Sequence, residues 1–369
     1  MKVAIMGAGL SGLACAIMLE RNGVYPTIYE SRSKVGDRFI NGEALFSILT
    51  RPINDSISYL SNEYELYLKP TSHIGQMVIH SENSKATINE RIGFVNIRGR
   101  HELSFENQLA EQVNSELIFN SEKSYEELSQ EYTHVVMATG DASYAVKVKN
   151  FKEDLSVTLK GATVEGNFER FSVSVWLNNE LAPKGYGYLL PFSDKEANIV
   201  IAFPDEAIKT DEEINKLWDR FFQTVCSELG QSLKITDQFQ IRNYKIGICN
   251  APRIGNTFFT GNCFGAIMPF LGFGQFQALL TGIYAAQDIC GLGTYEQLTK
   301  PLMKSYEHSL ILRRALEQMN NNTYDFLISH LDGRIGSKIF QQSTHNPLKV
   351  LSYLIRPFIK KEPRYLRNE

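Results

Sequence analysis

Residues 2–30, KVAIMGAGLSGLACAIMLERNGVYPTIYE, decide the fold class of this chain. An apolar strand is expected over residues 3–6, and a glycine-rich turn separates it from a helix that ends near Arg21. A second apolar strand over residues 26–29 ends at Glu30. A strand, a glycine turn, a helix and a strand in this order are typical of a βαβ unit. The sequence therefore predicts an α/β chain with a Rossmann-like domain.

Three glycines in this turn predict a dinucleotide site. Gly7 permits the tight turn, Gly9 lets a pyrophosphate approach the backbone, and Gly12 lets the helix pack against the strand. The helix N-terminus directs free N–H groups and the positive end of its dipole at the phosphates. Glu30 follows the turn by about 20 residues, where an acid can bond ribose hydroxyls. The alternative, a glycine-rich turn without a ligand, leaves the position of Glu30 unexplained.

A second glycine-rich stretch, TGNCFGAIMPFLGFG at residues 260–274, lies in a segment that has no charge from Ile254 to Gln287. A membrane-spanning helix needs ~20 predominantly apolar residues, so the length is available. However, Gly265 and Pro269 would interrupt such a helix. A buried loop that runs into a buried helix is the favoured interpretation, because its glycines let the backbone come very close to another group.

Three further features indicate the type of dinucleotide. Residues 133–140, THVVMATG, form a β-branched strand that ends in a small-residue turn, and residues 258–262, FFTGN, end in a glycine and an amide. A second glycine turn then opens a helix near Gly274. Two glycine turns that each lead into a helix can hold the opposite ends of one long cofactor, which favours FAD over NAD.

On these residues the chain resembles FAD-dependent oxidoreductases of the para-hydroxybenzoate hydroxylase-like group, most closely the geranylgeranyl reductase-like branch. The family's motifs are similar to RGRHELSFENQLAEQ (98–112), ATGDASYAVK (138–147), APKGYGYLLPF (182–192) and GNCFGAIMPFLGFG (261–274). The resemblance, together with the first turn, implies FAD contacts at Gly7, Gly9, Gly12, Glu30, Arg98, Ala138, Gly140, Gly261, Asn262, Gly272 and Gly274.

The same resemblance implies a reaction. It is the reduction of a C=C bond in a hydrophobic, isoprenoid or lipid-like substrate by hydride from flavin N5. NAD(P)H is the expected electron donor, and ferredoxin or another flavoprotein are the alternatives. Tyr186 and Tyr188 are the candidate wall of the substrate pocket, and packing within a sheet is their alternative role. The catalytic proton donor is not predicted. A flavin monooxygenase or dehydrogenase on another small molecule, and a flavin-binding protein without turnover, stay as alternatives.

Three positions depart from the family. Asn262 replaces an aspartate that bonds the ribityl hydroxyls, so an aspartate at this position is expected to be tolerated. Thr139 replaces an acid that is associated with NADPH use in the hydroxylases, which argues against the monooxygenase alternative. Asn41 stands where the branch has a cysteine, so thiol-dependent control at that place is not expected.

Beyond the FAD motifs, apolar and polar residues alternate from Leu155 to Ile248, which predicts an antiparallel sheet with one helix near residues 211–229. Apolar spacing of three and four residues from Tyr295 onwards predicts helices. The expected division is an FAD-binding domain at 1–150 with an excursion at about 43–90, a substrate domain at 151–250, a closing segment of the FAD domain at 251–292, and a helical region at 293–369.

Composition limits the partners. A net charge of −3 gives no reason to expect nucleic acid. Five cysteines without ligand spacing predict free thiols in a reducing compartment and no metal site. The N-terminus lacks the features of a signal peptide, so a cytoplasmic location is expected. The oligomeric state is not predicted.

The C-terminal segment, residues 346–369, carries six Lys or Arg against two Glu, interleaved with apolar residues. A helix docked on its own protein is the favoured interpretation. The alternative is a basic amphipathic segment in peripheral contact with an anionic membrane.

Overall fold

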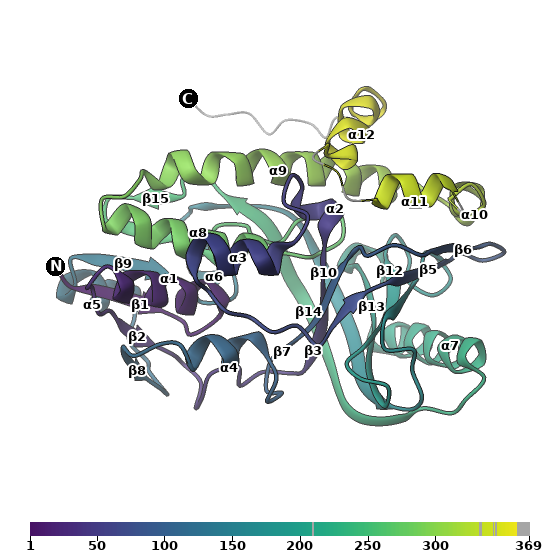
Figure 1. Cartoon of the computed structure of the whole chain (residues 1–369), viewed down its shortest axis with the longest axis horizontal. Helices are drawn as coiled ribbons and strands as arrows, with labels where there is room; N and C mark the ends of the chain where they lie inside the picture. Colours follow the sequence, from purple (N-terminus) through teal and green to yellow (C-terminus); the bar gives the residue numbers. More distant parts are fainter. Residues whose placement is uncertain (209, 332–333, 342, 344, 360–369) are drawn as a thin grey trace.

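The computed structural model describes residues 1–208, 210–331, 334–341, 343 and 345–359. A six-stranded sheet forms one half of the molecule, and a seven-stranded sheet forms the other half (Figure 1). The first sheet has the strand order β15 (Arg253–Ile254), β16 (Thr257–Phe259), β9 (His134–Met137), β1 (Val3–Met6), β2 (Thr27–Tyr29) and β8 (Glu116–Ile118). Its neighbouring strands are parallel except for the β15–β16 hairpin.

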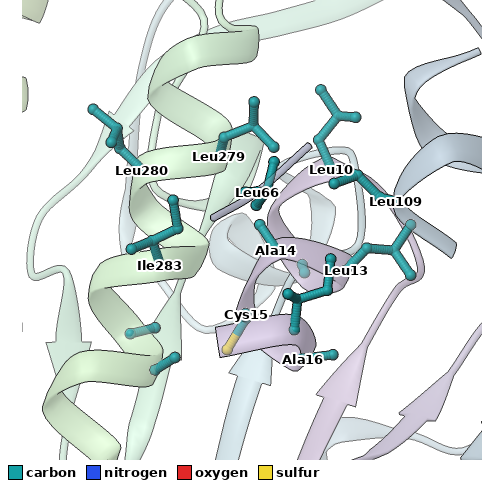
Figure 2. Close-up of a cluster of buried hydrophobic side chains, with 14 of the residues drawn as sticks. Leu10, Leu13, Ala14, Cys15, Ala16, Leu66, Leu109, Leu279, Leu280 and Ile283 are labelled. Carbon is teal, nitrogen blue, oxygen red and sulfur yellow. The ribbon is translucent and has the colours of Figure 1, made fainter. Parts of the chain in front are cut away.

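Two helices lie side by side against this sheet and bury its main core. Helix α1 (Leu10–Arg21) follows the first glycine turn, and α8 (Gln275–Ile289) follows the second. Figure 2 shows Cys15 on the side of α1 that faces α8 and Ile283, whereas Leu13 lies beside Leu109. A Cβ atom at Gly282 would lie 2.0 Å from the Ser11 carbonyl oxygen, so glycine is needed for this close approach.

The seven-stranded sheet has the order β14 (Lys234–Cys249), β10 (Phe151–Glu165), β13 (Glu196–Pro204), β12 (Tyr186–Pro191), β11 (Ser172–Trp176), β5 (Gln76–His80) and β6 (Lys85–Ile88). Helix α7 (Asp211–Leu229) covers one face, where Trp218 and Phe221 pack on the apolar side chains of β13. Its start is fixed by a capping box between Thr210 and Glu213.

A three-stranded sheet connects the two larger ones. It has the order β3 (Asn41–Phe46), β7 (Gly93–Arg98) and β4 (Ser72–Ile74), all antiparallel. Asn198 of β13 accepts a buried hydrogen bond from the Gly42 amide at 3.0 Å, which holds β3 against the seven-stranded sheet. The remaining short helices between α1 and β10 are α2 (Ser47–Thr50), α3 (Ser56–Tyr64), α4 (Phe105–Ala110), α5 (Tyr125–Glu131) and α6 (Ser143–Lys147).

The C-terminal region is helical, as the sequence predicts. Helix α9 (Tyr295–Leu316) runs along α8 across the top of the molecule in Figure 1. After it come α10 (Asn321–Ser329), α11 (Arg334–Phe340), α12 (Pro347–Ile355) and the 3₁₀ turn η3 (Arg356–Phe358). Residues 360–369 of the predicted amphipathic segment lie outside the described residues. Within the described ranges, no helix combines the length and apolarity that crossing a membrane requires.

The predicted fold class is confirmed, with one correction to the second sheet. Strands β5 and β6 come from the segment 43–90, which the sequence assigns to an excursion of the FAD domain, and β5 pairs with β11 in parallel. The sheet is therefore mixed rather than purely antiparallel. The sequence missed this because strand pairing over about 100 residues leaves no local pattern. The domain boundaries stay a prediction.

Candidate functional site

A cavity of about 670 Å³ lies where the sheets meet. One end is lined by the glycine turn before α1, and the other by Tyr186 and Tyr188 of β12. It therefore joins the predicted FAD residues to the predicted substrate wall. Nine of the eleven predicted FAD residues line it: Gly9, Glu30, Arg98, Ala138, Gly140, Gly261, Asn262, Gly272 and Gly274.

The first glycine turn has the geometry that its spacing predicts. Gly7 has φ +110°, and a Cβ there would lie 2.2 Å from the Ala138 carbonyl oxygen. A Cβ at Gly12 would lie 2.1 Å from the Gly7 carbonyl oxygen. These two glycines thus shape the turn and its packing from outside the cavity lining, whereas Gly9 faces the cavity itself. A Cβ at Gly9 would meet no heavy atom of the described chain within 4 Å.

Glu30 lies at the end of β2, beside this turn. Its Oε2 accepts from the Ala8 amide at 2.8 Å, and its Oε1 accepts from the Arg32 amide at 2.9 Å. These bonds fix the carboxylate at the rim of the cavity, at the position where the sequence predicts ribose recognition.

Asn262 joins two turns in the middle of the cavity. Its Nδ2 donates to the Gly140 carbonyl at 2.6 Å and to the Tyr244 hydroxyl at 2.7 Å. The side-chain amide therefore connects the turn after β9 to the turn after β16. This geometry revises the expectation that aspartate is tolerated here, because a carboxylate cannot donate to the Gly140 carbonyl and would face it with like charge.

The loop before α8 is shaped by glycines at its end. Gly272 has φ +67°, and a Cβ at Gly274 would lie 2.6 Å from the Ala266 carbonyl oxygen. Gly274 is the N-cap of α8, so the first-turn amides of this helix begin at the cavity wall. The Tyr186 hydroxyl donates to the Leu271 carbonyl and holds the loop against β12.

Arg98 is enclosed by two acids at the cavity. Its Nε lies 2.7 Å from Glu106 Oε1, and its Nη1 lies 3.2 Å from Glu43 Oε1. Burial works against the charged guanidinium, but the charges of Glu106 and Glu43 outweigh it and raise the pKa of Arg98. The residue is therefore a fixed cation that has its own counter-ions.

Both predicted substrate tyrosines are buried in the wall. The Tyr188 hydroxyl donates to Asn41 Oδ1 at 3.1 Å. Asn41, the residue that the sequence aligns with a family cysteine, therefore positions the Tyr188 ring. Burial raises the pKa of both phenols, Tyr186 and Tyr188. Each ring thus packs in the sheet and also lines the cavity, and its contact with a substrate stays a prediction.

A further apolar part of the cavity lining has no role assigned by the sequence. It comes from one face of β10 and β14 and from the loop before α8: Leu155, Val157, Leu159, Ile241, Ile246 and Ile267. The period-two apolar pattern of β10 was visible in the sequence. Which face of β10 lines the cavity depends on how the sheets pack against one another. The alternation of apolar and polar residues along β10 does not predict this packing.

Comparison with known proteins identifies the fold. Residues 5–43 match a family model described as an NAD(P)-binding Rossmann-like domain. No curated protein sequence matches the chain. Among solved structures, a geranylgeranyl bacteriochlorophyll reductase-like protein from Thermoplasma acidophilum has a TM-score of 0.75 at 15% identity, over 95% of both chains.

Flavin-dependent halogenating enzymes share this fold. The flavin-dependent brominase Bmp2 has a TM-score of 0.63 at 12% identity, over 97% of this chain and 98% of its own. A halogenase PltM variant in complex with FAD has a TM-score of 0.64 at 12% identity, over 97% of this chain and 84% of its own. The resemblance predicted from the sequence is therefore confirmed at the level of the fold, which is that of flavin-dependent oxidoreductases and halogenases.

Proposed function

We propose that this chain is an FAD-dependent oxidoreductase that reduces a C=C bond of a hydrophobic substrate. One observation carries the proposal: a single cavity runs from the glycine turn of α1 to an apolar wall on the seven-stranded sheet. Its volume of about 670 Å³ lies within the ~300–1,000 Å³ of small-molecule sites. The cavity thus offers cofactor and substrate contacts within one space.

The residues fit FAD at both ends. At the first, Gly9 leaves open space beside the N-terminus of α1, where a pyrophosphate would meet backbone amides, and Glu30 stands ready for ribose hydroxyls. At the second, Gly272 and Gly274 shape the loop before α8, and the first amides of this helix would be available to the flavin ring. Two helix N-termini at the two ends suit one long cofactor that carries phosphates in its middle and a polar ring edge at its end.

Bound FAD would supply hydride transfer from its N5 atom to one alkene carbon. Residues of the chain determine the electrostatic potential at the proposed flavin site. The positive end of the α8 dipole would favour negative charge on a ring edge nearby, whereas the charge of Arg98 is offset by Glu43 and Glu106. The Tyr186 and Tyr188 protons are committed to Leu271 and Asn41, so neither phenol is proposed as the proton donor.

The apolar wall supports a hydrocarbon substrate. Removing a ligand from water stabilises binding by about 25 cal/mol per Å² of apolar surface, so a long chain needs few polar anchors. The lining also includes charged groups. Arg98 is paired with Glu43 and Glu106, Arg313 with Glu317, and Lys245 with Glu153. The charged residues Arg32, Asp37 and Arg38, which follow β2 in the chain, also line the cavity. NAD(P)H is the proposed electron donor.

The decisive experiment begins with the purified protein under anaerobic conditions. We expect a yellow protein that releases FAD on denaturation, and bleaching of its absorbance by NADPH. An isoprenoid alkene should then restore the oxidised spectrum and yield the saturated product by mass spectrometry. Recovery only with O₂, together with an oxygenated product, would establish the monooxygenase alternative instead. A colourless protein that does not take up FAD would contradict both.

A further inference from the structure

Helix α12 and the turn η3 present large apolar side chains to solvent. Five of them, between 43% and 82% exposed, fall within nine residues: Val350, Leu351, Tyr353, Leu354 and Phe358. We refer to these five as the α12 apolar surface. Figure 1 shows α12 above α9, on the outside of the molecule. Single exposed apolar side chains need no explanation, but a contiguous group of five indicates a binding surface.

The orientation of α12 reverses that of an ordinary surface helix. A surface helix turns its apolar stripe to the core and its polar face to water. In α12 the buried position is Ser352, whose Oγ lies 2.8 Å from His308 Nδ1 of α9 and donates to the Lys349 carbonyl. The remaining protein-facing positions are only half-buried, at Leu348 and Ile355. The contact between Ser352 and His308 thus holds α12 with its more apolar side toward solvent.

Positive charge borders the α12 apolar surface. Successive helical residues are about 100° apart, which places Lys349 and Arg356 together along one edge of the exposed apolar arc. The sequence from Asn346 to Ile359 contains no acid. On the α9 side, Lys304 adds another cation, while Glu307 is the opposing charge near His308.

The pKa of His308 is affected by the same positive charges. Its pKa is lowered first by burial and then by the positive charges of Lys349, Arg356 and Lys304, against which Glu307 acts. The positive potential at the base of α12 is thus felt by a side chain that contacts the helix.

We propose that α12 and η3 lie in the headgroup region of an anionic lipid bilayer, with the α12 apolar surface toward the acyl chains. Interfacial helices combine an apolar arc with flanking Lys and Arg, whose stems extend along apolar surface while their charges reach the phosphates. Apolar side chains alone would be enough to bind a protein partner. The cations beside the α12 apolar surface, and the lack of acidic residues from Asn346 to Ile359, are instead complementary to a negatively charged lipid surface. The inference stands apart from the cofactor and the reaction.

The test is flotation of the full chain with vesicles, measured without substrate or added cofactor. Vesicles of phosphatidylcholine with about one third phosphatidylglycerol should carry the protein, and raised salt should weaken the association because the charge contribution is screened. The double variant Leu351→Glu/Leu354→Glu should lower the partition coefficient by about a hundredfold, because two buried leucines are lost. The matched control is Leu292→Glu, a residue 63% exposed in the turn after α8, which should bind as the parent does.

Several outcomes would overturn the proposal. The parent chain could fail to float with anionic vesicles, it could float equally with pure phosphatidylcholine at any salt, or the double variant could float as well as the control. A dimer of the parent that the double variant makes monomeric, without vesicle binding, would show a self-association surface instead. If the double variant does not fold, Lys349→Glu/Arg356→Glu tests the charge contribution, and undiminished flotation of that variant counts against the bilayer.

Discussion

Replacing Gly9 with valine isolates the proposed contact between the chain and the FAD pyrophosphate. A Cβ at this position meets no heavy atom of the described residues within 4 Å, and Gly9 has φ −89° and ψ −174°, which valine can also adopt. The new side chain therefore fits the protein and enters only the cavity. We expect Gly9→Val to fold, with a free energy of unfolding lowered by about 1 kcal/mol, because Gly9 is the N-cap of α1 and valine is a poorer N-cap than glycine.

The magnitude for FAD follows from the bonds that the side chain would prevent. Backbone amides of the α1 turn would donate about two charge-assisted hydrogen bonds to phosphate, at roughly 1.5–3 kcal/mol each. Their loss weakens FAD binding by about 3–6 kcal/mol, or roughly two to four orders of magnitude in Kd.

The assay pairs an FAD titration, followed by flavin fluorescence, with thermal unfolding of the FAD-free protein. Gly12→Val is the contrasting variant, because a Cβ there would lie 2.1 Å from the Gly7 carbonyl oxygen and should lower both affinity and stability. Normal FAD affinity in Gly9→Val would refute the placement of the pyrophosphate. Unfolding of that variant would refute the open space at the turn.

Three further changes test other parts of the molecule. Asn262→Asp should lower the free energy of unfolding by about 1–3 kcal/mol, since two donated bonds are lost beside the Gly140 carbonyl; unchanged urea denaturation would contradict this. Tyr186→Phe should weaken FAD binding about fivefold by releasing the Leu271 carbonyl, and an FAD titration with no change would show that the loop holds without this bond. Burial lowers the pKa of His80 from 6.5 to about 4, so the unfolded chain binds a proton that the folded chain rejects. Between pH 7 and 4 this group should remove about 3 kcal/mol of stability, and His80→Gln, followed by urea denaturation, should show a smaller loss.

The sequence predicts the first half of the fold because its signals are local. The strand, turn and helix around Gly7, Gly9 and Gly12 follow each other directly, and the structure shows a steric reason for glycine at positions 7 and 12. Helix α7 begins and ends at the residues that its pattern indicates, since a capping box and a glycine at position 230 mark its two ends.

The substrate end depends on contacts between distant segments, which a pattern cannot supply. That β5 joins the second sheet, and that β10 turns Leu155 and Val157 to the cavity, follows from packing and not from alternation. The sequence and the structure lead to different predictions for Asn262→Asp for a related reason. The sequence shows an amide in place of an acid, but its partner, Gly140, comes from a turn more than 100 residues away.

The cofactor end and the substrate end of the cavity are joined by side-chain hydrogen bonds that cross between sheets. Tyr186 of β12 holds the loop before α8, and Asn198 of β13 holds Gly42, whose carbonyl accepts from the Tyr188 hydroxyl. Each such bond stabilises the assembly by about 1 kcal/mol, enough to change an affinity fivefold. A variant in the substrate wall can therefore alter FAD binding without touching FAD. Thermodynamic reciprocity requires the converse, so substrate selectivity is a meaningful readout only when each variant's FAD affinity is measured beside it.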